Sequence, residues 1–97
     1  MSLKYKTVFA EKVDHELAEI RDLLLIKNEA YGDSALNPIR VFSKADPVEQ
    51  LRVRIDDKLS RLTRGADAGE DTLADLVGYL VLLRIALAER NAEPTNL

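Results

Sequence analysis

The longest apolar stretch of this chain lies near its C-terminal end. The run from Leu73 to Ala88 is hydrophobic except at four positions: Asp75, Gly78, Tyr79 and Arg84. A helix of this composition is apolar on all sides and has to be covered on all sides. Two further helices of a 97-residue monomer are too few to cover it. We therefore expect a homo-oligomer in which copies of the helix Leu73–Ala88 pack together and complete a four-helix-bundle-like core.

A first helix is predicted from Thr7 to Tyr31, where Gly32 offers the left-handed residue that ends many helices. Its apolar stripe recurs at helical spacing and comprises Ala10, Val13, Leu17, Ile20, Leu24 and Tyr31. The opposite side carries charged residues, which we interpret as a solvated face: His15, Glu19, Asp22 and Glu29.

A second helix is predicted to run to Arg64, with Gly65 just beyond it. Its first turn combines Asp46 as N-cap with Pro47 and Glu49. The residues expected to be buried are Val48, Leu51, Ile55, Leu59 and Leu62. The third helix repeats the same capping pattern with Asp67 and Glu70 and continues to about Arg90.

The segment from Asp33 to Lys44 is predicted to be a structured loop because Asn37-Pro38 disfavours helix. We expect its apolar side chains to anchor it on the core: Ile39, Val41 and Phe42. No strand pattern or internal repeat competes with the three helices. The prediction is an all-α fold in a single domain of residues 1–97, with loose termini at 1–6 and 91–97.

The composition of the chain disfavours several kinds of partner and site. The net charge of −3 disfavours nonspecific nucleic-acid binding, which needs clustered Lys and Arg. No apolar run approaches the roughly 20 residues of a membrane span. The chain has no cysteine, and so no disulfide or thiolate metal site. We see no leader pattern at the N-terminus, and the cytoplasm is the expected compartment.

Two carboxylates are expected at the head of the third helix. Asp71 and Asp75 are four residues apart and would share one helix face with Gly78 and Leu82. Charged groups on such a face need a counter-ion. The helix dipole explains Asp71 without any ligand, but it explains Asp75 less well because Asp75 is expected beyond the first turn.

The second helix carries a charged face beside its apolar stripe, formed by Arg54, Asp57, Lys58 and Arg61. One interpretation is that Asp57 joins Asp71 and Asp75 around Mg²⁺, an ion that prefers oxygen ligands. Arg54, Lys58 and Arg61 would then bind phosphate oxygens. The alternative is a lattice of surface ion pairs, each contributing a few tenths of a kcal/mol.

A polar residue and an aromatic ring occupy the end of the first helix. Asn28 and Tyr31 suit recognition of a base by hydrogen bonding and stacking, and they equally suit an Asn that caps its own turn.

Three blocks of this sequence carry a resemblance to a known family: residues 27–34 (Lys-Asn-Glu-Ala-Tyr-Gly-Asp-Ser), residues 54–62, and residues 70–79. They resemble the nucleotide-modification-associated domain family, small helical proteins found mostly in phages and prophages. The helix order and the gap from Asp57 to Asp71 are also similar to the MazG-type nucleoside triphosphate pyrophosphohydrolases. Asp75 matches the last acid of their motifs, whereas Arg54 and Thr72 occupy positions where that type has acids.

The resemblance implies a MazG-like helical fold and a nucleotide-binding protein of phage nucleotide or DNA-modification metabolism, with Mg²⁺-dependent pyrophosphohydrolysis as its activity. The alternative from the residues alone is a noncatalytic helical module that oligomerises. In that module, Asp57, Asp71 and Asp75 would be salt-bridged to arginines for structure: Arg54, Arg61 and Arg84.

Overall fold

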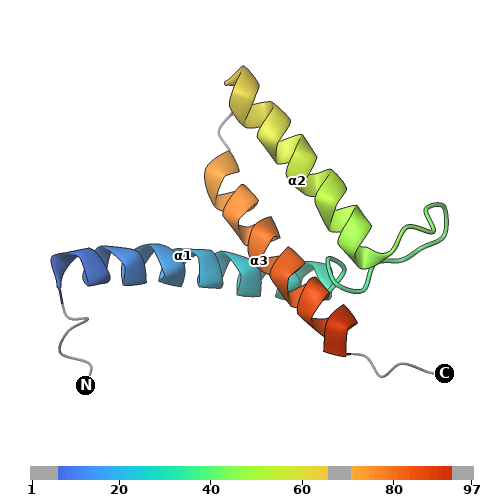
Figure 1. Cartoon of the computed structure of the whole chain (residues 1–97), viewed down its shortest axis with the longest axis horizontal. Coiled ribbons are helices and arrows are strands. Elements are labelled where there is room, and N and C mark those ends of the chain that lie inside the picture. The colour runs from blue at the N-terminus through green and yellow to red at the C-terminus, as the bar shows by residue number, and fades with distance from the viewer. Residues whose placement is uncertain (1–6, 66–70, 93–97) are drawn as a thin grey trace.

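The computed structural model describes residues 7–65 and 71–92, which fold into three α-helices without a β-strand. The helices are α1 (Val8–Tyr31), α2 (Pro47–Arg64) and α3 (Thr72–Ala92). α2 and α3 form an antiparallel hairpin, and α3 crosses the C-terminal half of α1 (Figure 1). The predicted all-α class with three main helices is confirmed.

The ends of α1 and α2 follow from local capping. The Thr7 hydroxyl accepts a hydrogen bond from the Ala10 amide at 3.0 Å, and the Asp46 carboxylate accepts one from Glu49 at 2.8 Å. Gly32 and Gly65 follow the two helices with φ angles of 62° and 64°. Both are left-handed conformations that glycine adopts without a Cβ penalty.

The start of α3 differs from the expectation. Asp71 precedes the helix, and its carboxylate accepts a hydrogen bond from the Ala74 amide at 3.0 Å. Asp71 is therefore the N-cap of α3, and Asp75, expected beyond the first turn, lies within it. The capping residues predicted from the sequence, Asp67 and Glu70, lie outside the described residues.

The core lies between α2 and α3. Val48, Leu51 and Ala86 form its buried centre. Ile55 and Leu76 are also buried, and Thr72 is fully inaccessible at the start of α3. The stripe predicted for α2 is thus confirmed over its first three positions. Of the last two positions, Leu62 is half-buried, whereas Leu59 is exposed.

The loop between α1 and α2 does not pack as predicted. Ile39 is 86% exposed, Phe42 is 99% exposed, and Val41 is exposed as well. The prediction that these three side chains anchor the loop is wrong. Arg40 and Lys44 donate side-chain hydrogen bonds to each other's carbonyl oxygens at 2.6 and 3.0 Å, so this part of the loop closes on itself. Contact with the core comes earlier in the loop, from Ala35 and Leu36.

The apolar stripe of α1 is only partly covered. No residue of α1 is buried, although Ile20 and Leu24 are half-buried where α3 crosses. Val13, Leu17 and Tyr31, which were expected in the core, are exposed. The reason is geometric: the N-terminal half of α1 extends past the hairpin, as Figure 1 shows.

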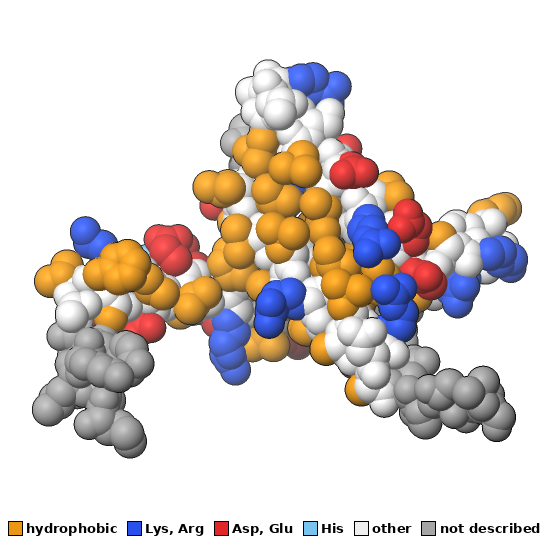
Figure 2. All heavy atoms as spheres, in the orientation of Figure 1, with side chains coloured by type: hydrophobic (Ala, Val, Ile, Leu, Met, Phe, Trp, Pro, Cys, Tyr) orange, Lys and Arg blue, Asp and Glu red, His pale blue; other side chains and the backbone are white. Residues whose placement is uncertain are grey.

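α3 also keeps part of its apolar surface outside the core. Leu73, Leu80 and Ile85 are exposed. Hydrophobic side chains gather over α3 and the adjoining side of α2, and they reappear along the projecting part of α1 (Figure 2). Within the described ranges, no helix is long and apolar enough to cross a membrane.

Candidate functional site

A cleft of about 550 Å³ opens where the end of α1, the following loop, the start of α2 and the middle of α3 meet. Its volume lies in the range of small-molecule sites. Leucines and other apolar side chains form much of the wall, including Leu23, Leu24, Leu51 and Leu82. The polar lining residues are Lys27, Asn28, Tyr31, Ser34, Gln50, Arg54, Asp75 and Tyr79.

Asp75 joins the three helices at the edge of this cleft. Its Oδ1 atom accepts a hydrogen bond from Lys27 Nζ of α1 at 2.9 Å, and its Oδ2 atom accepts one from Lys58 Nζ of α2 at 3.4 Å. The side chains of Asp75 and Lys58 are only 13% and 12% exposed, whereas Lys27 is 45% exposed. The two ammonium groups supply the counter-charge that a largely buried carboxylate requires.

The protonation of this bridge reflects its surroundings. Burial alone would raise the pKa of Asp75, but the hydrogen bond and charge of Lys27, together with Lys58, outweigh burial and lower that pKa below its ordinary value. The hydrogen bond to Asp75 raises the pKa of Lys27, and it exceeds the opposing effect of burial. Both groups are therefore charged at neutral pH.

Aromatic rings stand next to these charges. Lys58 Nζ lies 6.0 Å from the centre of the Tyr79 ring, at the outer limit of a cation–π contact. Tyr31, at the end of α1, lines the cleft and is otherwise exposed. Two tyrosines thus border the same cavity that holds the ion bridge.

The two predicted base-binding residues, Asn28 and Tyr31, both line the cleft. The backbone carbonyl of Asn28 accepts the amides of Gly32 and Asp33, at 2.8 and 3.3 Å, and so caps α1. Its side-chain amide makes no hydrogen bond within the described part of the chain, which leaves that group available in the cleft.

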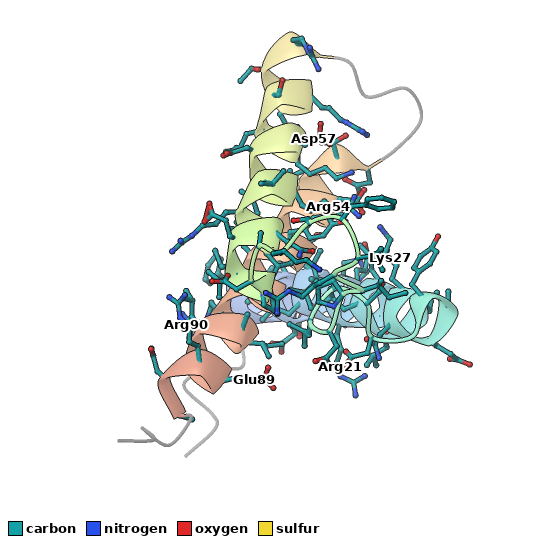
Figure 3. All side chains as sticks on the ribbon, turned by 90° about the vertical axis from the view of Figure 1, so that its right-hand side faces the viewer. Arg21, Lys27, Arg54, Asp57, Glu89 and Arg90 are labelled. Carbon is teal, nitrogen blue, oxygen red and sulfur yellow. The ribbon has the colours of Figure 1, made fainter. Side chains whose placement is uncertain are left out.

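The three predicted phosphate-binding residues do not lie together in the cleft. Arg54 lines the cleft, and it lies near Lys27 in Figure 3. Lys58 reaches the cleft edge through Asp75. Arg61 pairs with Asp57 at 3.3 Å on the outer side of α2.

The predicted magnesium ligands are not brought together. Asp57 pairs with Arg61, Asp71 caps α3, and Asp75 is held by two lysines. Residues 7–65 and 71–92 contain no group of three acidic or histidine side chains placed to hold a metal ion. The arrangement present here therefore does not fit Mg²⁺ held by these three aspartates.

Sequence reasoning missed Lys27, Gln50 and Tyr79 as cleft residues. Lys27 is the most informative omission, because it lies one helical turn before Tyr31 and so shares its face. That spacing was available in the sequence. The contact between Lys27 and Asp75 was not, because it joins residues 48 positions apart.

Comparison with known proteins adds no relative: the chain matches no protein-family model, no curated protein and no solved structure. The resemblance to the nucleotide-modification-associated and MazG-type families therefore stays a prediction. The function has to be argued from the cleft itself.

Proposed function

We propose that this protein binds a phosphorylated nucleotide in the cleft between α1, α2 and α3. The observation that carries the proposal is the composition of one cavity, which unites Asn28 and Tyr31 with Arg54 and Lys27. An exposed tyrosine ring offers stacking to a base, and a free side-chain amide offers hydrogen bonds to the base edge.

The charge balance of the cleft favours an anion. Lys27 and Arg54 line the cleft, opposed by one lining carboxylate, that of Asp75, which Lys58 also contacts from α2. Arg54 forms no ion pair with any described residue, so its guanidinium is available to a ligand. Guanidinium groups bind phosphate oxygens in a bidentate manner, and these charge-assisted hydrogen bonds are among the stronger polar contacts.

Isothermal titration calorimetry of the full chain with nucleoside mono-, di- and triphosphates tests the proposal. Arg54→Gln is expected to weaken binding about tenfold or more, because a charge-assisted hydrogen bond contributes about 1.5–3 kcal/mol. Arg52→Gln is the matched control, since Arg52 pairs with Glu49 at 3.4 Å outside the cleft. The absence of binding by every nucleotide, or equal losses in both variants, would contradict the proposal.

Hydrolysis of the phosphate chain with Mg²⁺ remains the prediction of the family resemblance, as does a place in phage nucleotide or DNA modification. The Asp75→Asn variant distinguishes two roles of this carboxylate. A magnesium ligand would lose the Mg²⁺-dependent part of nucleotide affinity. If Asp75 is instead a counter-ion, its replacement would remove the carboxylate that neutralises Lys27 in the cleft, and nucleotide affinity measured in EDTA would rise. The ion bridge favours the second result.

A second candidate is the noncatalytic helical module that oligomerises through α3. Two observations favour it: the apolar residues exposed on α3, and the pairing of Asp57 with Arg61 as that hypothesis predicts. The pairing of Asp75 with lysines departs from the predicted arginine partners. The two functions are compatible, because the exposed apolar residues of α3 (Leu73, Leu80 and Ile85) do not line the cleft.

A further inference from the structure

We infer that a second copy of this chain covers one continuous apolar surface, formed by the projecting half of α1 and the adjoining side of α3. The inference extends the α3 oligomer proposed above and does not rest on the nucleotide proposal, although the apolar surface borders the cleft at Leu24, Asn28 and Leu82. It assigns the larger share of the contact to α1, on which Leu17 is the central residue.

The stripe of α1 has a covered and an uncovered part. Leu24 contacts α3 so closely that a Cβ placed on Gly78 would lie 3.3 Å from Leu24 Cδ2. At 100° per residue, Phe9, Val13 and Leu17 point within roughly 60° of the direction of Leu24. All three are exposed, because α1 continues past α3 by several turns. The face that packs within the chain therefore continues where nothing among the described residues covers it.

An apolar hollow adjoins the uncovered part. It has a volume of about 450 Å³ and lies between α1 and α3. Most of its wall is hydrocarbon, from Leu17, Ile20, Leu25, Val81, Leu82 and Ile85. Leu17 belongs both to the hollow and to the projecting stripe, so the two features form one surface.

A second copy is the occupant that this surface fits. The surface contains a ridge, the α1 stripe, and a hollow of the same chemistry beside it. In a two-fold dimer, the α1 stripe of each copy would lie in the hollow of the other. Both apolar surfaces would then be buried in one contact.

Charge supports the same pairing. The projecting half of α1 is acidic, and Asp14 and Glu16 flank its stripe. Arg84, exposed on α3 close to Leu80, has no ion-pair partner in the described ranges.

Sedimentation velocity of the full chain tests the inference, because it measures the mass of the species in solution. Wild type is expected at twice 10.9 kDa. Leu17→Asp is expected to raise the dimer dissociation constant by about tenfold or more, because it places a charge in the apolar contact. Val53→Asp is the matched control: Val53 is 62% exposed on α2, close to the 58% of Leu17, and lies in neither the stripe nor the hollow. Leu80→Asp probes the contribution of α3.

Each outcome decides the matter. A monomeric wild type overturns both the inference and the α3 oligomer, and leaves the nucleotide proposal untouched. A dimer that survives Leu17→Asp but not Leu80→Asp overturns the role of α1 alone. Equal dissociation by Leu17→Asp and Val53→Asp also overturns it, since the effect would not be specific to the stripe.

A second measurement avoids reliance on a destabilised variant. The chain lacks cysteine, so Lys12→Cys provides a unique spin-label site on α1, outside the stripe. Pulsed electron paramagnetic resonance is expected to give one narrow distance between two copies. The absence of any distance at high protein concentration would overturn the inference.

Discussion

Gly78 of α3 lies directly against Leu24 of α1: a Cβ at residue 78 would be 3.3 Å from Leu24 Cδ2. The contact sets how near α1 lies to the hairpin. Both residues also line the cleft.

Gly78→Val is expected to lower the free energy of unfolding by about 1–3 kcal/mol, because the added methyl groups overpack the contact with Leu24. Urea denaturation followed by circular dichroism measures this change. Ala88→Val, at an exposed position of the same helix, controls for helix propensity and is expected to change stability by about 0.5 kcal/mol or less. A Gly78→Val variant as stable as wild type would show that α1 is free to shift.

Asp75→Asn is expected to cost about 1–2 kcal/mol of stability. The estimate lies between the values for exposed and buried ion pairs, since Asp75 is largely buried and Lys27 is not. Asp57→Asn removes a half-exposed pair with Arg61, and we expect it to cost under about 0.5 kcal/mol. Thermal denaturation of both variants checks the order, and a reversed order would contradict the central place of the Asp75 bridge.

The bridge also predicts a pH dependence. The pKa of Asp75 is lowered from 3.8, so its stabilisation is complete above about pH 5 and is lost as pH falls through the folded-state pKa, below 3.8. The pKa of Lys27 is raised from 10.5, so its stabilisation is complete below 10.5 and is lost as pH rises above the raised value. The stability difference between wild type and Asp75→Asn should therefore be flat from about pH 5 to 9 and shrink below about pH 4. Chemical denaturation across this range measures the difference, and a steady slope near neutral pH would be the contrary result.

Asp71 offers a test that separates capping from metal binding. Asp71→Ala should cost about 1 kcal/mol, whereas Asp71→Asn should preserve most of the stability, because Asn is as good an N-cap as Asp. Urea midpoints of the two variants without added metal make the comparison. Equal losses in both would mean that the charge of Asp71, rather than its hydrogen bond to Ala74, is what matters.

Tyr31 is expected to act on ligand affinity and not on the fold. Tyr31→Leu should weaken nucleotide binding about tenfold, whereas Tyr31→Phe should retain it, because stacking uses the ring and contributes about 1–3 kcal/mol per base. Calorimetric titration with the tightest nucleotide of the panel gives both affinities. Since Tyr31 is exposed, the melting temperatures of the unliganded variants should match wild type.

The helix boundaries that the sequence predicted well are those with local signals at both ends. α2 runs from Pro47 to Arg64 as expected, because Asp46 and Gly65 each act within a few residues. The start of α3 was harder to place, since several acidic residues in succession offer the same capping group. Asp71 takes that role in the structure.

The candidate site was predictable only in part, for a related reason. Asn28 and Tyr31 share a helix face, so their common location follows from spacing. The approach of Lys27 to Asp75 depends on how α1 crosses α3, and no short-range pattern encodes a crossing. Likewise, the apolar character of Phe42 suggested burial, but loop closure between Arg40 and Lys44 directs it outward.

The way α1 joins the rest of the molecule has a consequence for the order of folding. α2 and α3 pack along their lengths and are close in sequence, so they bring together the most contacts for the least loss of chain entropy. The hairpin should form first, and α1 should dock afterwards through its last turns. Amide hydrogens in the first half of α1 would then exchange with solvent sooner than those of the hairpin, and at a rate that falls as protein concentration rises.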